Sequence, residues 1–180
     1  MAKDPTTMKA RYSNLTLYHG TLASLVPSIM TKGLEPRSAS RPSHDAYMDS
    51  ASMVGFSYFT VHYGNALEHA CRISQRTKDA PAVAVLSVGM ASLKPKLRYP
   101  DEDYLKEEWN SDFTDWMLKE QLRYMKSHQD DWWESIDLLG TLAYKGVITP
   151  EAITVCHVPR WLEQEKRRKF PYREMVGVTR

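Results

Sequence analysis

The chain has 180 residues, of which 42% are hydrophobic and 26% are charged. These proportions are ordinary for one folded domain, and they exclude a chain that is mostly disordered. The formal net charge of +2 excludes the strong overall positive field of a dedicated nucleic-acid-binding protein, while a local basic patch stays open.

The first thirteen residues are polar and include three basic side chains. We expect residues 1–13 to form a flexible lead, because they contain no periodic apolar pattern. They also lack the apolar centre of a signal peptide, and no later stretch has the apolar length that spans a bilayer. The simplest expectation is therefore a cytoplasmic protein without a membrane partner.

The first element expected is a short strand over residues 15–19, which Gly20-Thr21 should end. A helix should follow over residues 22–30, where apolar residues recur at helical spacing and Gly33 falls just past the end. Residues 35–52 are rich in Ser, Pro, Arg and Asp and predict a long loop. Such a loop is typical either of a lid over a site or of an insertion without function.

The middle of the chain predicts two further strands around a helix. The aromatic run 55–60 and the apolar run 83–88 are typical of strands, and 62–75 presents an apolar helical face. Residues 93–100 contain two prolines and should be irregular or lie at a sheet edge.

The last third predicts a long helix over residues 101–129, whose aromatic stripe favours a core face. Two strands, 141–148 and 152–158, should then pair across Thr149-Pro150. Residues 166–180 form a basic tail, either a solvated end or a phosphate-binding surface. Residues 14–165 thus predict a single α+β domain with a mixed sheet rather than a doubly wound parallel one.

Neither a metal site nor a common phosphate-binding loop is visible in the sequence. The two cysteines, Cys71 and Cys156, lie in apolar contexts and are interpreted as buried thiols. The spacing of cysteines and histidines matches no common metal-binding motif, so we predict no bound metal. The glycines are spread singly, so a bound nucleotide would need another device.

One arrangement of motifs is more specific. Tyr18-His19-Gly20-Thr21 is followed by a predicted helix and Lys32-Gly33-Leu34, and later by Tyr58-Phe59-Thr60 before an alanine-containing helix. This order of parts resembles the ADP-ribosyltransferase-like fold, over about residues 15–90 and, more loosely, 138–158. The resemblance implies a split β-sandwich with flanking helices, NAD as co-substrate and a protein or nucleic-acid acceptor. It also suggests a toxin, a phage-encoded modifier or a small bacterial transferase.

The resemblance assigns NAD binding to the segments around His19 and Tyr58. A histidine at a strand end can donate a ring N–H to a ribose hydroxyl, and the adjacent Gly20 allows a close approach of the backbone to an amide. Tyr58 offers a ring for stacking on nicotinamide, while Phe59 should point to the opposite face of the strand. Tyr18, Thr21 and Thr60 complete the predicted binding segments.

The sequence departs from the family pattern at the catalytic acid. The resemblance places a glutamate at the head of a late strand, near Gly140 or Thr141, where this chain has no acid. Glu134 is the first candidate to replace it and Asp137 the second. Burial of Glu134 beside Trp132-Trp133 would raise its pKa and suit acid or base work, although an exposed acid at a helix end is equally compatible.

Other charged residues have two interpretations each. Asp101, Glu102 and Asp103 either cap the following helix and favour its dipole, or border the acceptor side of a pocket. Arg37 and Arg41 either clamp the pyrophosphate of NAD or belong to an ordinary loop surface.

Three functional hypotheses follow. The first is an NAD-dependent ADP-ribosyltransferase in which His19, Tyr58 and Glu134 are catalytic, with NAD hydrolysis as a variant of the same chemistry. The second is an RNA 2'-phosphotransferase, which in this fold works without the glutamate. The third is a catalytically inactive binding module of the same fold.

Overall fold

The computed structural model describes residues 4–36, 55–76, 82–104 and 118–156. Arg37 and Arg41 lie outside these ranges, as do most of the loop expected at 35–52 and all of the tail expected at 166–180. Among the helices that the structure describes, none combines the length and the apolar character that a bilayer-spanning segment needs.

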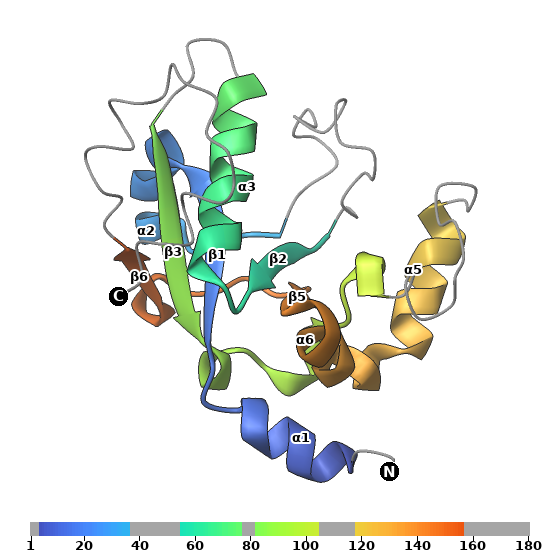
Figure 1. The fold of residues 1–180 in the computed structure, drawn as a ribbon. Helices are drawn as coiled ribbons and strands as arrows, with labels where there is room; N and C mark the ends of the chain where they lie inside the picture. Colours follow the sequence, from blue (N-terminus) through green and yellow to red (C-terminus); the bar gives the residue numbers. More distant parts are fainter. Residues whose placement is uncertain (1–3, 37–54, 77–81, 105–117, 157–180) are drawn as a thin grey trace.

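The described strands form one six-stranded sheet in the order β4-β5-β2-β1-β3-β6 (Figure 1). Their bounds are β1 Thr16–Leu22, β2 Ser57–Thr60, β3 Val83–Gly89, β4 Arg98–Tyr99, β5 Thr141–Tyr144 and β6 Ile153–Cys156. The pairings between these strands are antiparallel. The α+β class is therefore confirmed, but the expected mixture of parallel and antiparallel neighbours is wrong for the described sheet.

The pairing is uneven across the sheet. β1 and β3 pair along their whole lengths, from Thr16↔Gly89 to Leu22↔Val83. β1 and β2 share the single register pair Tyr18↔Thr60. The two predicted binding segments meet at the junction between β1 and β2. This junction thus has far less strand pairing than the junction between β1 and β3.

Helices cover both faces of the sheet. The α-helices are α1 Pro5–Tyr12, α2 Val26–Lys32, α3 Tyr63–Arg76, α5 Leu118–Ser127 and α6 Trp132–Leu139, and the short 3-10 helices are η1 Ala23–Leu25, η2 Met90–Ser92, η3 Pro95–Leu97, η5 Gln129–Asp131 and η6 Pro150–Ala152. Buried side chains of α1, α2 and α6 share one core with β1, β2, β3 and β5. α3 lies over the opposite face, where it packs on β1 and β3 (Figure 1).

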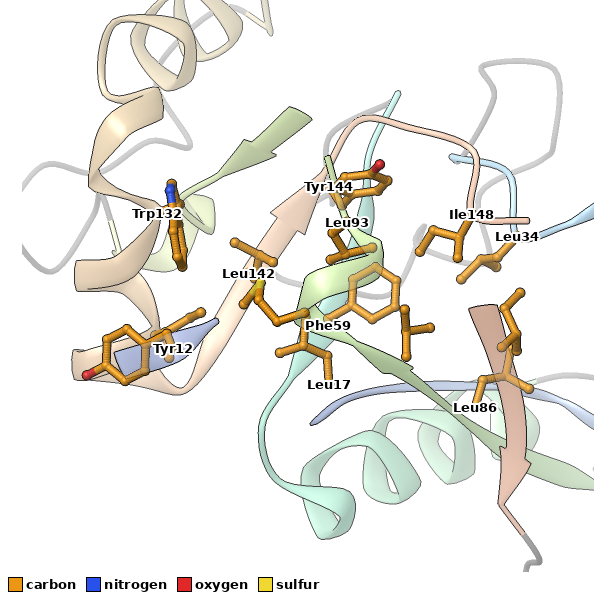
Figure 2. Close-up of a cluster of buried hydrophobic side chains, with 14 of the residues drawn as sticks. Tyr12, Leu17, Leu34, Phe59, Leu86, Leu93, Trp132, Leu142, Tyr144 and Ile148 are labelled. Carbon is orange, nitrogen blue, oxygen red and sulfur yellow. The ribbon is translucent and has the colours of Figure 1, made fainter. Parts of the chain in front are cut away.

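The larger core forms because alternate strand residues face α1, α2 and α6. Leu17, Phe59, Leu86 and Leu142 are each at most 2% exposed. Figure 2 shows these side chains as parts of one cluster, which extends from Tyr12 and Trp132 at one end to Leu86 at the other. This face of the central strands is therefore packed with apolar side chains.

Gly20 is required for the packing of α3 on the opposite face. A Cβ atom at this position would lie 1.9 Å from the backbone oxygen of Ala66 and 3.1 Å from the Cβ of Ala70. Because no real contact is that short, α3 approaches β1 as closely as it does only over a glycine. β1 runs through Gly20-Thr21 to Leu22, so the prediction that Gly20-Thr21 ends this strand is wrong.

The N-terminal lead differs from the expected flexible segment. Within residues 1–13, Pro5–Tyr12 forms helix α1, and Asp4 caps its start by accepting hydrogen bonds from the N–H groups of Thr6 and Thr7. Met8 and Tyr12 are buried in the larger core. The Tyr12 hydroxyl also donates to Asp137 Oδ1 at 2.6 Å. Two buried side chains at helical spacing were too weak a pattern to predict this helix.

The two late strands do not pair with each other, contrary to expectation. β5 lies between β2 and β4, whereas β6 pairs with β3 at the far edge of the sheet. β5 also ends at Tyr144 because the following chain leaves it: Ile148 instead exchanges backbone hydrogen bonds with Leu34, at 2.8 and 3.0 Å. The short edge strand β4 does confirm the expectation for residues 93–100.

Candidate functional site

The structure brings together His19 and Tyr58, which the sequence assigned to one site. They come from the adjacent strands β1 and β2, 39 residues apart in the chain, and His19 Nδ1 lies 2.8 Å from the backbone oxygen of Tyr58. The ring of His19 also packs against that of Phe59, with 5.5 Å between ring centroids. This side-chain bond joins the two strands where their backbone pairing is sparse.

The hydrogen bond fixes the tautomer of His19. A carbonyl oxygen only accepts, so Nδ1 carries the proton and donates it to Tyr58, and Nε2 of the neutral ring is an acceptor. Burial lowers the pKa of His19 from 6.5 to about 4, the charge of His69 on α3 lowers it further, and the bond to Tyr58 opposes the shift. The ring is therefore neutral at physiological pH. Because Nδ1–H is engaged with Tyr58, it is not free for the expected donation to a ribose hydroxyl, and the remaining nitrogen, Nε2, is an acceptor.

Tyr58 and Phe59 divide as expected between surface and core. Phe59 is 2% exposed and belongs to the larger core. Tyr58 is only partly buried and packs against a second cluster that contains Phe56, Tyr99 and Ala143. Of the two aromatic rings, Tyr58 is consequently the one that retains accessible surface.

The other predicted binding residues have structural roles. Tyr18 packs edge-on against Tyr63 of α3, with ring centroids 5.7 Å apart. Thr21 is buried, and the Thr60 hydroxyl, also on a buried residue, accepts from the backbone N–H of His62 at 3.1 Å, just before α3 begins. Gly20 lies beneath α3, so its close contact with Ala66 explains this residue without a ligand.

Glu134 lies in the first turn of α6 and is partly buried. Its Oε2 accepts from the Tyr104 hydroxyl at 2.5 Å, which ties α6 to the segment that begins with Asp101. The second candidate, Asp137, accepts from Tyr12 of α1. The hydrogen bonds of these two acids therefore run to Tyr104 and Tyr12, and the assignment of Glu134 to catalysis stays a prediction.

The sequence did not indicate that Glu102 is buried, whereas the structure shows that it is. Asp101 does cap the turn, since its Oδ1 accepts from the Asp103 N–H at 3.0 Å. Glu102, in contrast, is 6% exposed. Burial raises the pKa of Glu102 to about 8, the negative charges of Asp101 and Asp103 raise it further, and a hydrogen bond from the Tyr58 side chain partly opposes the shift. A run of three acids at a helix start gives no local sign of which one is buried.

The acidic turn is anchored at the head of β5. The buried Ser135 hydroxyl accepts from the Asp101 N–H at 3.0 Å and donates to the Thr141 carbonyl, also at 3.0 Å. Thr141 pairs with Thr60 on β2. Asp101, the residue before Glu102, is therefore linked through the Ser135 side chain to Thr141, at the strand head where the resemblance places an acid.

Comparison with known proteins adds no relative: no protein-family model, no curated protein and no solved structure matches this chain. The geometry around His19 and Tyr58 is therefore the basis on which a function is assigned.

Proposed function

We propose that this protein binds NAD and transfers its ADP-ribose group to a macromolecular acceptor, either a protein or a nucleic acid. The observation that carries the proposal is the hydrogen bond from the His19 ring to the backbone oxygen of Tyr58, which holds the two predicted binding segments next to each other. Two residues assigned to one ligand from separate motifs are neighbours in the folded chain, with the histidine held in a single tautomer.

The geometry supports distinct roles for the two side chains. His19 Nε2 accepts a hydrogen bond from a hydroxyl of the nicotinamide ribose, because Nδ1 is engaged with Tyr58. The partly exposed Tyr58 ring stacks on nicotinamide. Because His19 packs against Phe59, which alternates with Tyr58 along β2, the two side chains contact NAD from opposite sides of that strand.

The reaction breaks the glycosidic bond between ribose and nicotinamide. The bonding electron pair leaves with nicotinamide, the acceptor nucleophile forms a new bond to the ribose carbon, and the acceptor loses a proton. A carboxylate near the ribose would stabilise the positive charge that develops there. Glu134 remains the proposed acid on sequence grounds.

The proposal is tested by nicotinamide release and by labelled ADP-ribose transfer in a cell lysate. Wild-type protein should do both, and His19→Ala should abolish both. Release without transfer would indicate NAD hydrolysis. Removal of a 2'-phosphate from RNA, in place of ADP-ribose transfer, would replace the proposal by the phosphotransferase alternative, and absence of every one of these activities in wild type would leave an inactive binding module.

The role of Glu134 needs its own variant, Glu134→Gln. If this acid is catalytic, the variant loses turnover while it still binds NAD. A variant with wild-type turnover would show that Glu134 only holds Tyr104, the partner seen in the structure.

A further inference from the structure

Glu102 is a buried acid in which only one of the two carboxyl oxygens has a hydrogen-bond partner. The Tyr58 side chain provides one hydrogen bond to this carboxyl group and the backbone of Glu102 provides another. Within the described residues, Glu102 Oε2 is buried and has no hydrogen-bond partner, and the same is true of Thr141 Oγ1. Buried polar atoms are nearly always paired, so the unpartnered Oε2 of Glu102 requires an explanation.

We propose that Glu102 is a positioning residue for Tyr58, whose phenol it fixes from the acidic turn that Ser135 links to the head of β5. This inference rests on the proposed NAD chemistry. It differs from the assignment of Glu134, because Glu102 acts through the phenol of Tyr58 and reaches the site from the segment that follows β4.

Two connections fix the position of Glu102. The Tyr58 phenol donates to its carboxyl group, which ties the turn to β2. The preceding residue, Asp101, is tied to the β5 head through Ser135, which is 0% exposed. The side chain of Glu102 is thus linked to β2, and the backbone of the preceding residue is linked to β5, the strand that pairs with β2 along Ser57–Thr60. The Tyr58 side chain therefore cannot move to another χ1 rotamer without breaking its hydrogen bond to the buried Glu102 carboxyl group.

The charge of Glu102 should change how strongly the Tyr58 ring attracts a positively charged group. The carboxylates of Asp101 and Asp103 act on Glu102 from its own turn, the Tyr58 phenol acts from β2, and Glu134 on α6 is held by the neighbouring Tyr104. Since burial raises the pKa of Glu102 to about 8, the group is mostly neutral at pH 7 and ionises in mildly alkaline solution. A carboxylate that accepts from the Tyr58 hydroxyl makes the phenol ring more electron-rich, which favours the positive charge of the nicotinamide riboside part of NAD over the face of that ring, so kcat/KM for NAD cleavage should be higher when Glu102 is ionised.

The test is the pH dependence of kcat and KM for nicotinamide release between pH 6 and pH 9.5. For wild type, kcat/KM should rise about tenfold with a midpoint near pH 8. Glu102→Gln imitates the neutral carboxyl group, so this variant should keep the low-pH rate at every pH. Tyr58→Phe should also lose the rise, because it removes the phenol through which Glu102 acts.

Asp103→Asn is the matched control, since it removes an exposed charge from the same turn. The rise should remain in this variant, with its midpoint moved to lower pH because a neighbouring negative charge is gone. Thermal unfolding of each variant establishes that it is folded at the pH of the assay.

An unchanged rise in Glu102→Gln would overturn the inference and leave the transferase proposal standing. If wild type releases no nicotinamide, the transferase proposal fails. Infrared spectroscopy then decides whether Glu102 positions Tyr58. A protonated carboxyl band at pH 7 should disappear in Glu102→Gln and shift in Tyr58→Phe. Insensitivity of that band to Tyr58→Phe would overturn the positioning role.

Discussion

At the scale of single residues, His19 is the most constrained group in the candidate site. Its bond to the Tyr58 carbonyl selects the Nδ1–H tautomer, and burial of the ring disfavours the charged form. The same features that hold the ring in place also keep it neutral. A neutral histidine suits the acceptance of a hydroxyl hydrogen bond and does not suit the binding of phosphate through charge.

The neutrality of His19 is directly measurable. Its pKa of about 4 predicts that the ring remains neutral at pH 5. A titration of the histidine side chains by nuclear magnetic resonance, with His19→Gln to assign the signal, should show no protonation of this ring above pH 5. A midpoint near pH 6.5 would contradict the burial and the bonding described for His19.

At the scale of elements, the contact of α3 with β1 depends on one missing side chain. Gly20→Ala would place a Cβ atom 1.9 Å from the Ala66 backbone oxygen, so α3 would have to move away from the sheet. We expect a loss of about 3 kcal/mol or more in the free energy of unfolding, measured by denaturant titration.

Gly64→Ala is the control, because it lies within α3 and a Cβ atom there would meet nothing within 4 Å. This substitution should be neutral or should stabilise the protein by up to about 1 kcal/mol, since alanine is the better helix former. Equal losses in the two variants would show that the close approach of α3 does not decide the stability of β1.

Helix α1 is the other element with a specific attachment. Tyr12→Phe removes the hydroxyl that donates to Asp137 but keeps the buried ring, so the free energy of unfolding should fall by about 1 kcal/mol. Lys9→Ala removes an ion pair with Asp130, whose side chain is 97% exposed. This substitution should change the free energy of unfolding by under about 0.5 kcal/mol. A Tyr12→Phe variant as stable as wild type would argue that α1 is held by its apolar contacts alone.

At the scale of the whole molecule, stability should decrease as pH rises from 6.5 to 8. Glu102 has a raised pKa in the folded state, about 8 against an ordinary 4.5, so between these values the folded state binds more protons and loses stability with rising pH. His19 has a lowered pKa, and its opposite contribution is complete above 6.5. Glu102→Gln should therefore flatten the curve of unfolding free energy over this interval, and a slope equal to that of wild type would exclude Glu102 as its source.

The sequence predicted the elements whose signals are local. The aromatic run before α3 and the apolar run of β3 form strands, and α2 ends at Gly33, whose positive φ of 93° suits a glycine. It did not predict which strands are neighbours, because β5 and β6 are placed by contacts with β2 and β3. Glu102 was missed for the same reason: its burial depends on Tyr58 and on the anchoring of its turn by Ser135.

The most direct test of the proposed function is a calorimetric titration of NAD into wild type, His19→Ala and His128→Ala. His128 is the matched control, because its Nδ1 also bonds a backbone oxygen, that of Tyr124, at 3.0 Å. We predict that wild type and His128→Ala bind NAD alike and that His19→Ala binds at least about tenfold more weakly. Absence of NAD binding by wild type, or equal affinity in His19→Ala, would contradict the assignment of this site to NAD.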